Sequence, residues 1–373
     1  MRPQRISIQP LLNPVPKPST NPPSTNQRSM GSSTSSQAPS NPRPVRLAIA
    51  LGDPAGIGAE VTLKALARPE WRLDPTRQPL LVGCRRWLER SYQQLRPVSR
   101  EPLRDPAELE MVDLPLAEPC QAGISTPSCG AASFTWLTAA TDLVQQGRCQ
   151  ALVTAPIAKA SWHAAGHPYP GQTERLAELA GCPDASMLFT AVAPSGQWRL
   201  NTLLATTHIP LAAVPQRLNG PLIQRKLDAL LGFCQRFRPN PHLVVAGLNP
   251  HAGEAGQLGL EEATWLGAAL EAWRQHHPQV RLDGPVPPDT CWLDAASAWA
   301  GGGSGPDGYL ALYHDQGLIP VKLLAFDAAV NTTLGLPFLR TSPDHGTGFA
   351  IAGRGEARAA SMAAALVTAR DLG

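Results

Sequence analysis

The sequence lacks the patterns that mark several common classes of protein. No stretch approaches the roughly 18 consecutive apolar residues that a membrane-spanning helix requires, so we expect no membrane association. The seven cysteines, at positions 84, 120, 129, 149, 182, 234 and 291, are dispersed and include no C-x-x-C pair. An odd and scattered set favours free thiols in a reducing compartment over a disulfide framework. We therefore expect a cytoplasmic protein.

An excess of charge of one sign is also absent from most of the chain. The formal net charge is +3 over 373 residues, and residues 1–44 contain five Lys or Arg and no Asp or Glu. The other residues contain 27 basic and 29 acidic groups, a nearly neutral balance that argues against a nucleic-acid-binding surface. Hydrophobic residues make up 43% and charged residues 16%, which excludes a wholly disordered protein.

Residues 1–44 differ in composition from the rest of the chain. They contain ten of the 39 prolines and nine serines. Such a segment cannot bury enough apolar surface to offset its ordering entropy, so we expect a disordered tail before a folded region of residues 45–373. The tail is acidic-poor and Ser-rich like an organelle transit peptide. A start assigned too early, with Met30 as the true initiator, is the alternative.

The folded region alternates short apolar runs with helical patterns. The predicted strands are residues 45–52, 79–84, 109–114, 149–156, 198–207, 242–248 and 309–313. The predicted helices are residues 58–67, 85–95, 128–147, 222–237, 261–276 and 356–372. Continuous apolar strands that alternate with helices predict an α/β fold with a mostly parallel sheet covered on both faces.

Three histidines follow predicted strands in the same way. His208 ends LLATTH, His251 ends LVVAGLNPH and His314 ends YLALYH. In open α/β sheets, ligands bind beyond the carboxyl ends of the strands. Three imidazoles at that edge would bind one divalent metal and leave a coordination position for substrate. The alternative is that each is a hydrogen-bonded packing residue.

Several other residues suit an anionic ligand. Lys322, Asn331 and Arg340 follow His314, and the last two come at nine-residue intervals. Lys and Arg neutralise phosphate or carboxylate, and Arg does so with a forked pair of donors. Gln172 and Thr173 open a predicted helix, where free N–H groups also favour anions. Taken singly, these residues are equally compatible with solvated surface groups, and Thr173 with a helix N-cap.

Seven ordered segments carry a resemblance to a known family. They are GDPAGIGAE (52–60), GQTERLAELAG (171–181), ATTHIPL (205–211), LNPHAGEAGQLGLEE (248–262), GPVPPDT (284–290), YHDQGLIPVK (313–322) and VNTTLGLPFLRTSPDHGT (330–347). Over about residues 45–373 the chain resembles the 4-hydroxythreonine-4-phosphate dehydrogenase family of vitamin B6 biosynthesis.

The resemblance implies a fold, an assembly and a reaction. The fold would be a two-lobed α/β/α architecture like that of isocitrate and isopropylmalate dehydrogenases, with lobes interleaved in sequence. The family implies a homodimer in which both subunits build the site. NAD or NADP would oxidise the hydroxyl of 4-phosphooxy-L-threonine, and the resulting β-keto acid would lose CO₂. The product would be 3-amino-2-oxopropyl phosphate.

The resemblance also implies roles for individual residues. His208, His251 and His314 match the ligands of one divalent metal (zinc, magnesium or cobalt). Gln172, Thr173, Lys322, Asn331 and Arg340 match substrate contacts. Asp289 and Lys159 are candidate catalytic groups. The stretch DHGTGFAIAGRG is similar to the adenosine-binding loop of isocitrate dehydrogenases, which suggests Asp344, His345, Gly346 and Gly353 as cofactor-binding residues.

One departure from the family pattern affects the substrate. The family usually has G-H-T-E where this chain has Gly171-Gln172-Thr173-Glu174. Gln can hydrogen-bond an anion but carries no proton or charge. A four-carbon sugar-acid phosphate such as threonate 4-phosphate is therefore an alternative substrate. A phosphoryl- or acyl-transferring enzyme and a non-catalytic metal- or phosphate-binding module are alternatives of other classes.

Overall fold

The structure, a computed structural model, describes residues 45–72, 76–182 and 184–373. The expected tail, residues 1–44, lies outside these ranges. Eleven strands in the described part of the chain form one sheet. The strands are β1 Val45–Ala50, β2 Arg77–Gly83, β3 Glu110–Asp113, β4 Ala151–Thr154, β5 Ser186–Val192, β6 Arg199–Leu204, β7 His242–Ala246, β8 Arg281–Val286, β9 Gly308–Ala311, β10 Val330–Leu334 and β11 Leu339–Pro343.

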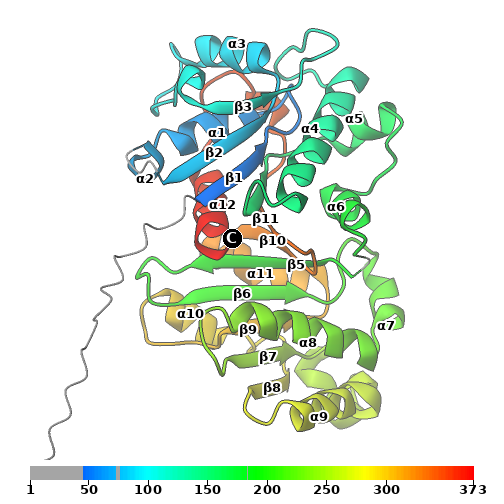
Figure 1. The fold of residues 1–373 in the computed structure, drawn as a ribbon. Coiled ribbons are helices and arrows are strands. Elements are labelled where there is room, and N and C mark those ends of the chain that lie inside the picture. Colours follow the sequence, from blue (N-terminus) through cyan, green and yellow to red (C-terminus); the bar gives the residue numbers. More distant parts are fainter. Residues whose placement is uncertain (1–44, 73–75, 183) are drawn as a thin grey trace, which may run out of the picture. The chain divides into compact units, whose positions relative to one another are not determined.

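The sheet consists of two parallel runs with antiparallel strands between them. Its order is β3-β2-β1-β4-β11-β10-β5-β6-β9-β7-β8 (Figure 1). The neighbours from β3 to β11 are all parallel, and so are those from β6 to β8. The pairs β11–β10, β10–β5 and β5–β6 are antiparallel. The predicted mixed α/β fold with a mostly parallel sheet is confirmed.

Helices connect the strands and cover both faces of the sheet. The α-helices are α1 Gly58–Leu66, α2 Pro69–Arg72, α3 Arg85–Leu95, α4 Pro127–Gln145, α5 Lys159–Ala164, α6 Gln172–Ala180, α7 Val214–Arg217, α8 Gly220–Cys234, α9 Gly267–His276, α10 Leu293–Trp299, α11 His314–Ala325 and α12 Ala360–Leu372. Each helix and strand that the sequence predicts is present, with ends shifted by a few residues. Strands β5, β8, β10 and β11 were not predicted.

Alternating burial explains why apolar runs form these strands. In β7, Leu243 and Val245 belong to one buried cluster with α8 and α9, whereas Val244 and Ala246 belong to another with α10 and α11. Successive side chains of a strand point to opposite faces, so a strand covered on both sides must be apolar throughout. A separate cluster surrounds β1, β2 and β4 with α1, α4 and α12. The division of residues 45–373 into two lobes remains a prediction.

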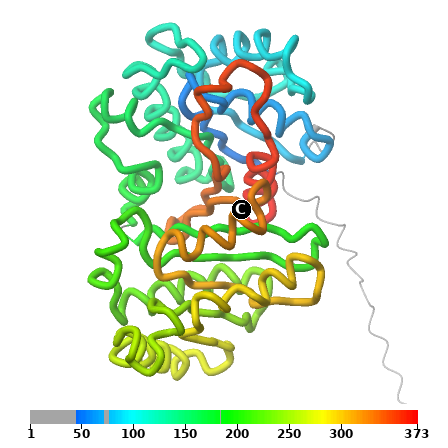
Figure 2. Tube along the Cα trace, turned by 180° about the vertical axis from the view of Figure 1, so that it is seen from behind, coloured from blue at the N-terminus to red at the C-terminus, as the bar shows by residue number. Residues whose placement is uncertain are grey.

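The chain returns to its first strands at its C-terminal end. The orange-to-red segment in Figure 2 passes from β10 and β11 to α12, which packs with β1 and β4 in one cluster. Lys64 of α1 fixes this return, because its buried Nζ donates to Gly355 O at 2.9 Å and Ala357 O at 2.8 Å. Glu60 balances that charge at 2.8 Å and also accepts from Ala357 N. The loop before α12 is therefore held against α1.

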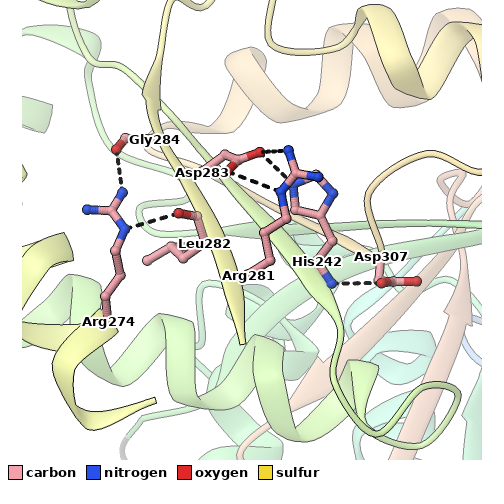
Figure 3. A network of polar contacts seen from close by, with 7 residues as sticks. All are labelled: His242, Arg274, Arg281, Leu282, Asp283, Gly284 and Asp307. Atoms are coloured by element: carbon pink, nitrogen blue, oxygen red, sulfur yellow. Dashed lines mark hydrogen bonds and ion pairs between the residues drawn. The ribbon is translucent and has the colours of Figure 1, made fainter. Parts of the chain in front are cut away.

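The outer edge of β8 is protected by a side chain. Arg274 of α9 donates from Nε to Leu282 O at 3.0 Å and from Nη2 to Gly284 O at 2.8 Å (Figure 3). Unpaired edge carbonyls invite pairing with another chain, and Arg274 occupies two of them. His242 Nε2 of β7 also bonds Asp283 Oδ2 of β8 at 2.7 Å, which links the two strands through their side chains.

None of the helices in the described ranges has the length and apolar character needed to cross a membrane.

Candidate functional site

A cavity of about 360 Å³ collects most of the residues that the sequence singles out. Its walls come from the ends or flanks of β4, β5, β10 and β11, the start of α6 and the residue segment after β6. The predicted site residues that line it are Lys159, Gln172, Thr173, His208, Asn331, Arg340, Asp344, His345 and Gly346. These positions are spread over almost 190 residues of sequence, so the fold brings them together.

Arg340 is a buried cation at the base of this cavity. Its side chain lies on β11, and the residue is only 3% exposed. Nη2 and Nε donate to Thr154 Oγ1 at 2.7 and 3.1 Å, and Nη1 donates to Thr333 Oγ1 at 3.2 Å. Burial lowers the pKa of Arg340 to about 10, so the group stays charged at neutral pH. Its hydrogen-bond partners among the described residues are neutral oxygens, which leaves its charge available to an anion.

Gln172 links this arginine to α6. Its Oε1 accepts from Arg340 Nη2 at 3.3 Å, and its Nε2 donates to Ala155 O at 3.1 Å. The helix begins at Gln172 with Gly171 as its N-cap, so the reading of Thr173 as a cap is wrong. Thr173 lies instead in the first turn, where backbone N–H groups have no partner within the helix. The start of α6 thus adds neutral donors to the charge of Arg340.

Asn331 supplies a buried polar atom that lacks a partner. It lies on β10, opposite Ser342 of β11, and both residues line the cavity. The Oδ1 atom of Asn331 is buried and makes no hydrogen bond within the described part of the chain. An unpaired buried acceptor costs free energy, so this atom is suited to receive a donor from a ligand.

Two of the three predicted metal ligands lie side by side. His208 follows β6 and His314 follows β9, and because these strands are parallel neighbours both residues come to the same sheet edge. The ring centroids are 5.3 Å apart. His314 Nδ1 bonds Asp315 Oδ1 at 2.7 Å, and since a carboxylate only accepts, Nδ1 carries the hydrogen and Nε2 is left for a ligand.

The protonation state of His208 also suits metal binding. Partial burial of the ring lowers its pKa, and the positive charges of Lys159 and His314 lower it further. The neutral imidazole is the form that binds a metal. Lys159 opens α5 and lines the cavity together with His208.

His251 does not complete a three-ligand cluster within one chain. It follows β7, which is parallel to β9, so it belongs to the same sheet edge as His208 and His314. Its backbone has a φ of +51°, and Ala252 continues this left-handed conformation. No group of three or more His, Cys, Asp or Glu residues within the described ranges is placed to hold a metal.

Three other predicted residues lie outside the cavity lining. Asp289 follows β8 and is exposed. Gly353 lies against Ala122. Lys322 of α11 forms an ion pair with the carboxylate of Asp344 and also donates to Asp344 O at 3.2 Å. Through Asp344, Lys322 is connected to the cavity wall.

The segment after β11 presents polar groups to the cavity. Burial raises the pKa of Asp344, although the ion pair with Lys322 opposes this shift. The Nε2 atom of His345 is buried without a partner among the described residues. A Cβ at Gly346 would meet nothing within 4 Å, so backbone there is open to a ligand. This segment therefore offers a ligand one unpartnered ring nitrogen and an open stretch of backbone.

Sequence reasoning missed the residues that hold Arg340. Thr154 ends β4, and Thr333 lies on β10 opposite Arg340. Thr154 lies two residues before the end of the predicted strand 149–156, so a search for polar residues near strand ends would have found it. Thr333 had no comparable signal because β10 was not predicted.

Comparison with known proteins decides the family. Residues 75–369 match the model of the family described as "Pyridoxal phosphate biosynthetic protein PdxA". A protein of Synechococcus sp. (strain RCC307) named 4-hydroxythreonine-4-phosphate dehydrogenase is 66% identical over 331 residues, which is 88% of this chain and 99% of that protein. The chain belongs to the 4-hydroxythreonine-4-phosphate dehydrogenase (PdxA) family. The predicted family and its oxidoreductase class are confirmed.

Other PdxA-family proteins agree with this membership. A protein of the same name from Synechococcus sp. (strain JA-3-3Ab) is 51% identical over 334 residues, covering 88% of this chain and 94% of that protein. The crystal structure of the Klebsiella pneumoniae 4-hydroxythreonine-4-phosphate dehydrogenase is 37% identical, with a TM-score of 0.73. The structural alignment covers 87% of this chain and 98% of the Klebsiella pneumoniae chain. The relatives do not favour the sugar-acid phosphate alternative.

Proposed function

We propose that this protein oxidises 4-phosphooxy-L-threonine with NAD or NADP and a divalent metal. A bound nicotinamide would accept a hydride from the hydroxyl carbon, and the hydroxyl proton would be released. The resulting β-keto acid would lose CO₂ and take up a proton to give 3-amino-2-oxopropyl phosphate. The observation that carries this proposal is the buried Arg340, whose hydrogen-bond partners among the described residues are neutral oxygens, in one cavity with His208. An anion anchor beside a pair of imidazoles suits a phosphorylated alcohol.

The phosphate is the part of the substrate that Arg340 recognises. Arg340 supplies the charge, the start of α6 supplies N–H donors, and the Oδ1 atom of Asn331 accepts from a substrate donor. Lys322 lies outside the cavity lining and is paired with Asp344, which lines it, so Lys322 would act on the substrate through Asp344. The phosphate does not react, so its contacts stay the same throughout the reaction. Their binding energy serves to position the reacting carbon.

The donor set at the sheet edge fits a divalent metal. The two rings are 5.3 Å apart, partial burial favours neutral His208, and Asp315 orients His314. Imidazole nitrogen suits zinc and cobalt better than magnesium. A metal bound there would act as a Lewis acid towards the substrate hydroxyl. His208 and His314 would hold it, and His251 would be the third ligand.

We propose that His251 of the partner subunit supplies this third ligand in a homodimer. One chain brings only two of the histidines together. The helix that begins at His314 exposes large apolar side chains. Ile319 and Leu323 of α11 and Phe326, its C-cap, are 60%, 79% and 56% exposed at helical spacing. Such a stripe marks a protein–protein contact.

The segment after β11 fits a nicotinamide cofactor. Asp344, His345 and Gly346 line the cavity, His345 Nε2 has no partner in the described ranges, and backbone at Gly346 is open. The cofactor supplies the hydride acceptor. Asp344 and His345 would orient it, and Lys322 holds Asp344 in place. Gly353 would act only through the packing of its own loop against Ala122.

Lys159 is the better placed of the two candidate acid–base residues. It lines the cavity and lies close enough to His208 for its charge to lower that histidine's pKa. Asp289 is exposed and outside the cavity lining. Lys159 would therefore take or return a proton at the reacting carbon's oxygen. A cytoplasmic location remains a prediction from the cysteine pattern.

A comparison of substrates tests the proposed function. The purified protein is given NAD or NADP, a divalent metal and either 4-phosphooxy-L-threonine or threonate 4-phosphate. We expect formation of reduced cofactor with the first substrate at a kcat/KM at least tenfold above the second. Equal or reversed preference would favour the sugar-acid phosphate. Absence of cofactor reduction with both would favour a transferase or a binding module.

A further inference from the structure

Two cysteines that the sequence spacing does not pair lie together in the structure. The Sγ atoms of Cys120 and Cys129 are 2.9 Å apart, and both are free thiols. Cys129 lies in the first turn of α4 and is 2% exposed, whereas Cys120 is partly exposed at the start of the preceding loop. The proposed reaction uses neither thiol.

The surroundings of this pair favour one thiolate and one thiol. The hydrogen bond from Cys120 lowers the pKa of Cys129 to about 6, and burial opposes this shift. Thr126, the N-cap of α4, adds a hydrogen bond from Oγ1 to Cys129 Sγ at 3.3 Å. The pKa of Cys120 is raised in turn, so Cys120 keeps its proton. A thiolate next to a second thiol is the arrangement that exchanges with disulfides.

Cys120 is also reachable from solvent. It lines a cavity of about 540 Å³ beside α3, separate from the candidate active site. Arg86 and Arg90 of α3 line the same cavity, and both are exposed. Asp113 and Glu118 line it as well, so the opening carries charges of both signs and is accessible to a small polar disulfide.

We propose that Cys120 and Cys129 form a reversible disulfide by exchange with an external disulfide. The Sγ–Sγ bond forms while the sulfur–sulfur bond of the external disulfide breaks. Two electrons and two protons leave the protein thiols with the external disulfide, which departs as two thiols. A dithiol reductant reverses the step. The two sulfurs are already in contact, so only a small approach to the bonded separation of about 2.05 Å is needed.

The disulfide would restrain the loop between the two cysteines. Within this loop, Gly123 N donates to Ala55 O at 2.7 Å and Ser125 Oγ donates to Asp53 Oδ2 at 2.7 Å. On its other side the loop meets the segment before α12, where a Cβ at Gly123 would lie 3.0 Å from Phe349 O. A bond between the loop's two ends therefore stiffens its contact with residues 53–55. This inference is independent of the proposed reaction.

Thiol counting and peptide mapping test the bond. The full chain is incubated with glutathione disulfide, the remaining thiols are alkylated, and the peptides are mapped. We expect wild type to lose two free thiols and to give a Cys120–Cys129 linkage that dithiothreitol reverses. The Cys120→Ser variant should form no such linkage. Cys182→Ser is the matched control and should behave as wild type. Cys182 is also partly exposed, and among the described residues its Sγ bonds a backbone oxygen, Ala180 O, at 3.3 Å rather than a second thiol.

Hydrogen exchange tests the restraint. Amide exchange in residues 121–126 should slow several-fold on oxidation of wild type and stay unchanged in Cys120→Ser. The proposal is overturned by stable glutathione adducts without the internal bond. Pairing of Cys120 with Cys84, which lines the same cavity, would also overturn it. Unchanged exchange in the oxidised wild type would overturn the restraint.

Discussion

Arg340 Nη2 donates to Gln172 Oε1 at 3.3 Å, and this contact explains how the chain tolerates its departure from the family motif. The amide of Gln172 accepts from the arginine and donates to Ala155 O, so it has a defined orientation. A histidine at this position would face a buried cation. Because the amide of Gln172 is neutral, it bonds Arg340 without placing a second positive charge beside it.

Replacing Gln172 with histidine should make stability depend on pH. Arg340 would lower the pKa of the new imidazole below its unfolded value of about 6.5. Since the unfolded chain then binds a proton more readily, stability is lost as pH falls below 6.5. We expect the melting temperature of Gln172→His to fall relative to wild type between pH 8 and pH 5. Gln172→Leu should show no such slope, and a slope shared by both variants would contradict the explanation.

Replacing Arg340 with methionine should separate stability from activity. A buried cation without a charged hydrogen-bond partner costs desolvation energy, so an apolar side chain of similar length should leave the melting temperature unchanged or raise it. Loss of the anion anchor should lower kcat/KM by about 100-fold, or about 2.7 kcal/mol, mainly through KM. Arg199→Met is the matched control, since Arg199 is a partly buried arginine that does not line the site cavity. Unchanged kcat/KM in Arg340→Met would remove Arg340 from the site.

Removing the charge of Lys159 should raise the pKa of His208. Partial burial of the ring, Lys159 and His314 all lower that pKa. Without the charge of Lys159, burial and His314 still lower it, but by less in total. We expect an NMR titration of the metal-free protein to place the His208 pKa below 6.5 in wild type and higher in Lys159→Met. Lys159→Arg keeps the charge and should titrate as wild type. An identical His208 titration in all three proteins would show that Lys159 does not act on the ring.

The strands that could be predicted from the sequence are those that are buried on both faces of the sheet. Strands β1, β4 and β7 are covered on both faces, so they appear as continuous apolar runs. Strands β10 (VNTTL) and β11 (LRTSP) escaped because they carry the polar side chains of the site. In β8, Gly284 and Pro285 interrupt the pattern that predicts a strand. The polar side chains that form the site therefore prevented the prediction of the strands on which Asn331 and Arg340 lie.

The site was partly predictable for a related reason. The three histidines share a strand-end position that is visible in sequence, and the parallel pairing of β6, β9 and β7 brings those ends to one edge. The pairing of Arg340 with Thr154 and of Cys120 with Cys129 depends on side-chain packing and carries no spacing signal. The sequence likewise does not indicate whether His251 binds a metal together with His208 and His314 of its own chain or with those of a partner subunit.

Mixing two inactive variants tests the shared metal site. If His251 of the partner subunit completes each site, a heterodimer of His208→Ala with His251→Ala contains one site with all three histidines. We expect the mixed protein, after subunit exchange, to recover up to half the activity of wild type per heterodimer. Each variant alone should be inactive. If all three ligands came from one chain, both heterodimer sites would be defective and mixing would restore nothing.

The most direct test of the central claim is the metal content of the purified protein after equilibration with zinc or cobalt and removal of free metal. The account predicts one ion per protomer in wild type and none in His208→Ala, His251→Ala or His314→Ala, with each variant still folded. A full complement of metal in His251→Ala would contradict it.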